Sequence, residues 1–119
     1  MKNVLIIESN TGIRENIAEL LELSQFNILT AENGFSGFKS AKTNTPDIVI
    51  CDMMEPQTGG DTFLWLAARD ATTKHIPLIL FTADPACPHA SPGAGAYKKY
   101  LQKPFSAEDL IHAVDESLA

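Results

Sequence analysis

One stretch decides the fold of this chain: Pro46-Asp47-Ile48-Val49-Ile50-Cys51-Asp52-Met53-Met54-Glu55-Pro56. The apolar run from Ile48 to Cys51 is short, rich in β-branched residues and bounded by prolines, which is typical of a buried strand. A strand that is apolar on both faces belongs inside a parallel sheet. Ligands of open parallel sheets bind beyond the carboxyl ends of the strands, so Asp52 is expected where chemistry is usually done. Taken alone, the stretch is equally consistent with a solvated loop aspartate.

Composition and charge set the class of protein. The 119 residues are 45% hydrophobic and 20% charged, which predicts one globular domain spanning residues 1–119. The formal net charge of −6 argues against direct nucleic-acid binding, because phosphate contacts need a basic surface. No apolar run approaches the roughly 18 residues of a membrane span, so we expect no membrane insertion and a cytoplasmic location. The cysteines and histidines lack metal-ligand spacing.

Short apolar runs alternate with amphipathic segments along the chain. The amphipathic segments predict helices that begin near Ile13, after Gly34, at Asp61 and at Ser106. This alternation indicates a three-layer α/β fold with a five-stranded parallel sheet. The expected arrangement is doubly wound and flavodoxin-like, with strand order 2-1-3-4-5. The apolar runs predict the strands 4–7, 26–31, 48–51, 77–81 and 97–101.

The single tryptophan, Trp65, falls within the third predicted helix, beside the apolar residues Phe63 and Leu64. An exposed tryptophan could serve as a stacking platform for a nucleic-acid base, but such platforms lie among basic residues. No basic cluster accompanies Trp65 in the sequence, so we interpret it as a packing residue.

Segment 84–96 departs from the alternation. A helix is due there, yet the segment contains Pro88, Pro92, Gly93 and Gly95. Proline costs about 3 kcal/mol and glycine about 1 kcal/mol in a helix interior, so these four residues add roughly 8 kcal/mol against a regular helix. That sum is comparable to the whole stability of a domain. We therefore expect the fourth helix to be short or disordered, as a loop or one short turn.

Polar residues follow several of the predicted strands. Glu8 follows the first strand and Asp52 the third, and these two strands are neighbours in the order 2-1-3-4-5. Two adjacent carboxylates repel unless a cation or a proton joins them, and hard oxygen ligands of this kind suit Mg²⁺. Thr82 and Lys103 would add a hydroxyl and an ammonium group at the same carboxyl edge of the sheet. Together these groups can hold a phosphoryl group.

This set of residues resembles the receiver domain of two-component response regulators. Each motif alone is common, whereas the ordered set is specific, and the resemblance runs the length of the chain. The residues that carry it are Val4-Leu5-Ile6-Ile7-Glu8, Arg14, Asp52 with Pro56 and Gly60, Thr82-Ala83, Tyr100 and Lys103-Pro104-Phe105.

The resemblance implies that Asp52 is a phospho-acceptor. It would receive the phosphoryl group from a sensor histidine kinase or a phosphotransfer protein, as an aspartate nucleophile. Glu8, Asp52 and the backbone carbonyl of Met54 would hold Mg²⁺. The domain would thus be a signalling module and not an enzyme, apart from self-catalysed phosphotransfer and dephosphorylation.

The resemblance also implies how the signal leaves the domain. Thr82 and Lys103 would bind the phosphoryl oxygens, and Thr82 and Tyr100 would form the switch. The Lys103–Pro104 bond would be cis, which only an X-Pro bond adopts at modest cost. The output would reach a downstream protein partner through a surface that includes segment 84–96, so the altered sequence of that segment predicts an altered partner.

One departure from the family pattern concerns the metal. The family has two adjacent acids after the first strand, whereas this chain has Glu8 followed by Ser9, which makes position 9 a weak or absent ligand. A pair of unit charges at about 4 Å and a dielectric constant near 20 is worth roughly 4 kcal/mol, and the desolvation cost that is no longer incurred offsets part of this loss. We therefore expect weak Mg²⁺ binding and slow phosphotransfer without the metal. Asn10 and Glu55 are the candidates to compensate.

Other functions remain open at this point. A pseudo-receiver would bind its partner independently of phosphorylation at Asp52. A flavodoxin-like FMN-binding protein is a second alternative, because Ser9-Asn10-Thr11-Gly12 resembles a hydroxyl-rich phosphate loop at a helix N-terminus. No output domain follows Ala119, which predicts signalling through a separate partner unless the chain is part of a longer protein.

Overall fold

The computed structural model of the protein describes residues 1–52, 60–82, 98–102 and 105–118, with only the backbone at 60, 61, 82, 98–100 and 102. Its strands form one sheet in the order β2-β1-β3-β4-β5, and every neighbouring pair is parallel. The doubly wound order predicted from the sequence is therefore confirmed. The strands are β1 (Asn3–Ile7), β2 (Asn27–Ala31), β3 (Ile48–Asp52), β4 (Leu78–Thr82) and β5 (Lys98–Gln102).

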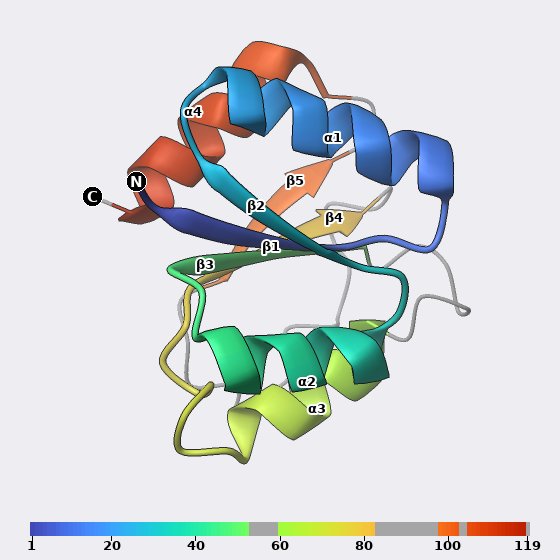
Figure 1. Ribbon diagram of the computed structural model, residues 1–119, viewed down its shortest axis with the longest axis vertical. Coiled ribbons are helices and arrows are strands. Elements are labelled where there is room, and N and C mark those ends of the chain that lie inside the picture. Colours follow the sequence, from blue (N-terminus) through green and yellow to red (C-terminus); the bar gives the residue numbers. More distant parts are fainter. Residues whose placement is uncertain (53–59, 83–97, 103–104, 119) are drawn as a thin grey trace.

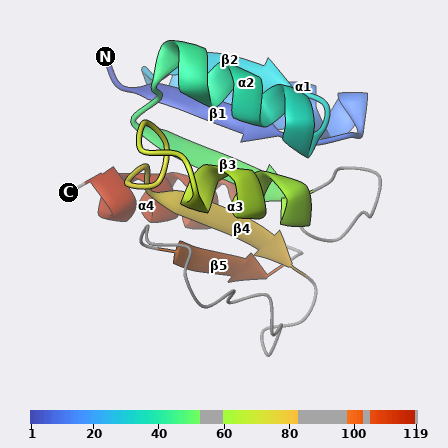
Figure 2. The same ribbon diagram turned by 90° about the horizontal axis from the view of Figure 1, so that it is seen from below.

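Four described helices complete a three-layer fold (Figure 1). They are α1 (Thr11–Leu23), α2 (Gly34–Asn44), α3 (Gly60–Ala68) and α4 (Ala107–Leu118). Helices α1 and α4 cover one face of the sheet, and α2 and α3 lie side by side on the other face (Figure 2). None of the helices in the described ranges combines the length and the apolar character needed to cross a bilayer. Segment 84–96, where we expected a loop or a short turn, lies outside the described residues.

Side chains at the helix ends account for where α1 and α4 begin. The Asn10 side chain accepts a hydrogen bond from the backbone N–H of Ile13 at 2.9 Å, which satisfies an otherwise orphaned donor of the first turn. The backbone N–H of Asp109 donates to Ser106 Oγ at 3.0 Å, and the Ser106 N–H donates to Asp109 Oδ2 at 3.2 Å. This reciprocal pair is a capping box, and it accounts for the helix start that the sequence predicts at Ser106.

The sheet divides the hydrophobic core in two. One cluster lies between the sheet and α2 and α3, and the other lies between the sheet and α1 and α4. The central strand β3 is buried along its whole length, including Cys51. A continuous apolar run is what a strand covered on both faces needs.

Several large apolar residues of the helices lie away from the core, among them Leu23 at the end of α1, which is 77% exposed. Trp65 is 58% exposed, so the interpretation of this residue as a packing residue was wrong. Ile13 and Phe35 are also exposed, at 39% and 56%. The physical reason is the helical period: the outward side chain of Trp65 lies opposite Phe63, Leu64 and Ala67, which already fill the sheet-facing side of α3.

Small residues bring α2 close to the sheet. Gly34, Gly37 and Ala41 are the buried residues of this helix. A Cβ atom added to Gly37 would lie 2.4 Å from Ile7 Cδ1 and 2.7 Å from Ile7 Cγ1, both closer than van der Waals contact. Ile7 is only 1% exposed, so its side chain has little room to move. The glycine is therefore explained by this close approach.

We predict that Gly37→Ala destabilises the protein, because overpacking of about 1–3 kcal/mol outweighs a helix-propensity gain of about 1 kcal/mol. Ile7→Val alone should cost about 0.5–1.5 kcal/mol. In the double variant the nearer of the two clashing atoms, Ile7 Cδ1, is gone, so the losses should be less than additive. Urea denaturation of the four proteins measures this coupling. Additive losses would mean that Gly37 and Ile7 do not meet in the way described.

An ion pair joins α2 to the turn after α3. Lys42 Nζ lies 3.1 Å from Asp70 Oδ2, and the backbone N–H of Thr72 donates to Asp70 Oδ1 at 2.8 Å. The hydrogen bond from Lys42, followed by that from the Thr72 backbone, lowers the pKa of Asp70 from its ordinary value of 3.8. Because the folded-state pKa is depressed, the stabilisation is fully present above the unfolded-state pKa and is lost as the pH falls through the folded-state value.

We predict that Asp70→Asn lowers the urea midpoint at pH 7 and that the difference from wild type shrinks as the pH falls below about 4. The exposed residue Asp115 on α4 supplies the matched control, Asp115→Asn. A gap between wild type and Asp70→Asn that stayed constant from neutral to acidic pH would contradict a role for the charge.

Candidate functional site

Two buried carboxylates lie at the carboxyl ends of neighbouring strands. Ile7 of β1 pairs with Cys51 of β3, so the residues that follow them, Glu8 and Asp52, are adjacent across the sheet. Each is only 1% exposed. The acids that the sequence placed at two separate strand ends are therefore brought together by the parallel register of β1 and β3.

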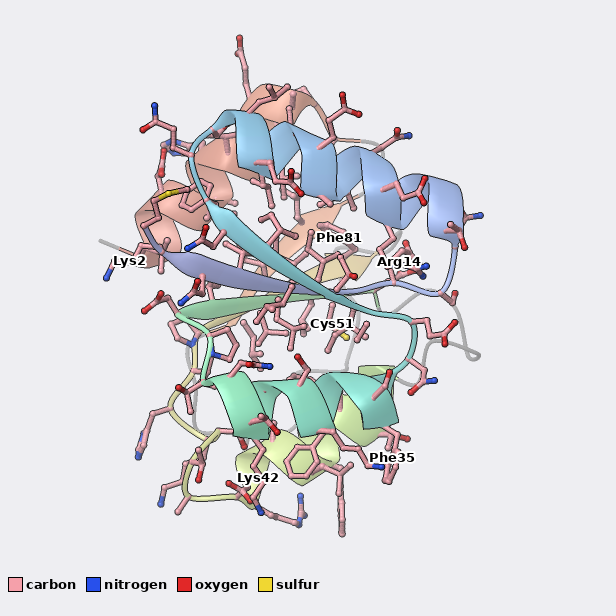
Figure 3. All side chains as sticks on the ribbon, in the orientation of Figure 1. Lys2, Arg14, Phe35, Lys42, Cys51 and Phe81 are labelled. Carbon is pink, nitrogen blue, oxygen red and sulfur yellow. The ribbon has the colours of Figure 1, made fainter. Side chains whose placement is uncertain are left out.

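The alternation of side chains along the strands assigns the two acids to one face. Cys51 belongs to the core cluster beneath α2 and α3, whereas Ile50 belongs to the cluster beneath α1 and α4. Asp52, the next residue, therefore lies on the α1 and α4 side, and so does Phe81, its partner in the β3–β4 register. Figure 3 shows Cys51 and Phe81 on opposite sides of the sheet.

The backbone around Glu8 is held by three contacts. The Glu8 N–H donates to the carbonyl of Ala31 at 3.0 Å, and Arg14 Nη1 donates to the Glu8 carbonyl at 2.7 Å. The backbone N–H of Asn10 donates a longer bond, 3.4 Å, to Glu8 Oε2. Together these contacts fix the turn that leads from β1 into α1. Because the bond from the guanidinium group is short and charge-assisted, Arg14 is the strongest of these anchors.

Arg14 acts here in a way that the sequence reasoning missed. Its place in the first turn of α1, six residues after Glu8, was noted only as part of a motif. A basic side chain in the first turn after a strand-end acid is the signal that could have found this contact, since the macrodipole does not favour a cation there. Arg14 also lines a cavity of about 360 Å³, together with Thr30, Ala31, Glu32 and Ser36. Neither Glu8 nor Asp52 is among the residues that line that cavity.

For the remaining predicted site residues, the structure describes the side chain of some, only the backbone of others, and nothing of the rest. Ser9 is half-buried and directly follows Glu8. Thr82 ends β4, and Tyr100 of β5 pairs with Leu80, but the side chains of Thr82 and Tyr100 lie outside the described part of the structure. Four further residues from the sequence analysis lie outside the described part of the structure: Met54, Glu55, Lys103 and Pro104.

The donor set fits a hard cation only in part. Mg²⁺ is bound by one or two carboxylates and by waters, and Glu8 and Asp52 can supply two carboxylates. Within the described ranges no group of three His, Cys, Asp or Glu side chains could hold a metal ion. The side-chain oxygen of Asn10 accepts the capping bond from Ile13, so it is engaged away from the acid pair. The same capping role explains the Ser9–Gly12 turn, which had suggested a flavin phosphate loop.

Comparison with known proteins gives a consistent picture. The family model of the response regulator receiver domain matches residues 4–115. The chain is 34% identical to the phosphate regulon transcriptional regulatory protein PhoB of Pseudomonas aeruginosa, over 92% of this chain and 48% of that protein. It is 32% identical to the hybrid signal transduction histidine kinase D of Dictyostelium discoideum, over 93% of this chain and 7% of that protein. The chain thus spans less than half the length of these curated relatives.

A solved structure shares the fold. The receiver domain of the sensor histidine kinase PA1611 of Pseudomonas aeruginosa superimposes with a TM-score of 0.84, covering 98% of this chain and 97% of that one, at 20% sequence identity. That receiver domain holds a magnesium ion coordinated in its active-site cleft.

Proposed function

The chain belongs to the response regulator receiver domain family, and we propose that its Asp52 accepts a phosphoryl group from a sensor histidine kinase or a phosphotransfer protein. Receiver domains are signalling domains of two-component systems, and we propose that residues 1–119 form one such domain. The observation that carries the proposal is the burial of Asp52 beside Glu8, at the carboxyl edge of a doubly wound sheet. A family assignment alone would leave the acceptor unidentified.

The proposed transfer needs a carboxylate and a phosphohistidine. An oxygen of Asp52 attacks the phosphorus atom, and a new O–P bond forms as the P–N bond to the kinase histidine breaks. The electron pair of the broken bond returns to the imidazole nitrogen, which then takes up a proton. Because such transfer involves little covalent chemistry by the protein, its rate depends mainly on positioning and on neutralising charge.

Glu8 and Asp52 would hold Mg²⁺, with the backbone carbonyl of Met54 as a further proposed ligand. When bound, Mg²⁺ neutralises charge on the acids and on the phosphoryl oxygens. Ser9 supplies a hydroxyl where a second acid would supply a full negative charge. This chain should therefore bind the metal weakly, and a kinase that completes the site would raise the rate of transfer.

Residues at or near the ends of β4 and β5 are the candidates for binding the phosphoryl group and for transmitting the signal. We propose that Thr82 and Lys103 hold the phosphoryl oxygens and that Thr82 and Tyr100 pass the change to the surface. Thr82 ends β4, and β4 lies directly between β3, which ends in Asp52, and β5, which contains Tyr100. The output would be a protein partner, since the net charge of −6 disfavours direct binding to nucleic acid.

We predict that incubation with acetyl phosphate and Mg²⁺ adds the mass of one phosphoryl group to the wild-type protein and none to Asp52→Asn, because the amide is not a nucleophile of this kind. Intact-mass spectrometry measures the result. Asp115→Asn, at an exposed aspartate of α4, is the control and should be labelled like wild type. A wild type that takes up no phosphoryl group, either here or from a histidine kinase, would instead favour a phosphorylation-independent binding module.

We also predict that Ser9→Asp tightens Mg²⁺ binding about tenfold or more, since each 1.4 kcal/mol is a factor of ten and the added Coulomb attraction is larger before desolvation. Ser9→Asn has a side chain of the same size without the charge and should change the affinity little. Calorimetric Mg²⁺ titration of the three proteins gives the comparison. Equal affinities for all three would show that position 9 lies outside the metal site.

A further inference from the structure

Charge is divided across the sheet. Helices α1 and α4 carry seven acidic residues, all exposed, and a single basic residue, Arg14, which is engaged with the Glu8 carbonyl. On the opposite side, α2 has no acidic residue, and α2, α3 and the turn after α3 together contribute Lys39, Lys42, Arg69 and Lys74 against Asp61 and Asp70. The sheet separates the two helix layers (Figure 1), so the exposed acids of α1 and α4 lie on the opposite side of the molecule from these cations.

The basic side also exposes aromatic rings. Phe35 and Trp65 are 56% and 58% exposed, and each ring lies beneath a cation four residues later in the chain, Lys39 within α2 and Arg69 just after α3. Lys39 Nζ is 4.7 Å from the centre of the Phe35 ring, and Arg69 Cζ is 4.2 Å from that of Trp65. Arg69 is further held by a bond from Nη1 to the Trp65 carbonyl at 2.9 Å. We call these four residues the basic aromatic face.

The composition of this face is that of a binding surface. Tryptophan and arginine are the residues most enriched among those that dominate the energetics of protein interfaces. A pre-formed cation–aromatic pair loses little side-chain entropy on binding, because the Arg69 side chain is already held in place. Lys42, by contrast, is paired with Asp70 within the molecule, so it contributes less to a partner.

A complementary surface lies on the opposite side of the same molecule. Glu15, Glu19 and Glu22 recur on the outward side of α1, opposite the buried residues Ile17 and Leu21. Leu23, at the end of this row, is 77% exposed and adds an apolar contact. We call Glu15, Glu19, Glu22 and Leu23 the acidic stripe. It presents carboxylates and an aliphatic side chain, the groups that a surface of cations and aromatic rings would accept.

We propose that the basic aromatic face of one copy of this chain docks on the acidic stripe of a second copy. The two surfaces lie on opposite sides of the sheet, so the contact is head-to-tail and leaves both end surfaces available for further copies. The net charge of −6 opposes association at long range, but at physiological salt a Debye length of about 8 Å screens it while contacts at the interface persist. This inference goes beyond the proposed phosphotransfer and does not require Asp52.

Sedimentation of the wild-type protein tests the association. Between about 10 μM and about 1 mM, the average mass should rise above the 12.9 kDa of one copy without stopping at a dimer. Trp65 is the only tryptophan, so its emission should shift to the blue over the same range as the ring is covered. The association should be weaker at about 1 M salt than at about 0.1 M salt. A protein that stays monomeric at about 1 mM overturns the proposal.

A pair of blocked variants locates the contact. Trp65→Ala with Arg69→Glu removes the basic aromatic face, and Glu19→Lys with Glu22→Lys removes the acidic stripe. Each variant alone should remain monomeric, whereas their equimolar mixture should form a dimer and nothing larger, because one intact surface of each kind remains. Formation of that dimer also shows that both variants are folded.

Two control variants test whether the loss of association depends on where the charge is changed or only on the change in net charge. Lys2→Glu makes the same charge change as Arg69→Glu at an exposed site on neither surface, and it should associate like wild type. Glu108→Lys with Asp115→Lys repeats the stripe's charge change on α4 and should also leave association intact. Association by either blocked variant alone, or a mixture that stays monomeric, would contradict a head-to-tail contact between these two surfaces.

Discussion

The parallel pairing of β1 with β3 at the centre of the sheet is the constraint on which the candidate site depends. It aligns Ile7 with Cys51 and thereby sets Glu8 beside Asp52. Burying two like charges together is unfavourable unless a cation, a proton or hydrogen bonds compensate. The protein nevertheless keeps both acids almost inaccessible, at the edge where doubly wound sheets bind their ligands.

The two helix layers meet the sheet in different ways, and this difference shapes the surface. On one side, Gly37 allows α2 to approach Ile7 closely, and the large side chain of Phe35 points away from the core. On the other side, Ile17 and Leu21 fill the space between α1 and the sheet, while glutamates cover the exterior. The aromatic rings and the acids are therefore exposed on opposite sides of the molecule, and the sheet keeps them apart.

Much of the fold and part of the site could be predicted from local patterns. Apolar runs identify the strands because a strand buried on both faces must be apolar throughout, and the Ser106–Asp109 capping box identifies the start of α4. The packing role assigned to Trp65 was wrong because a helical aromatic residue can lie on either side of the helix, and Phe63 and Leu64 already occupy the inner side. The Arg14 contact with the Glu8 carbonyl was missed because it joins a side chain to the backbone across a turn.

The sequence by itself determined which segments become strands, and that Glu8 and Asp52 each follow one, because hydrophobic periodicity and chain order are local properties. The replacement of a second acid by Ser9, from which we predict weak metal binding, is likewise visible in the sequence alone. Only the tertiary structure decided that the two acids are neighbours on one face and that Arg14 anchors the turn between them and α1. Contacts between residues distant in the chain depend on strand register and helix crossover, which no local pattern specifies.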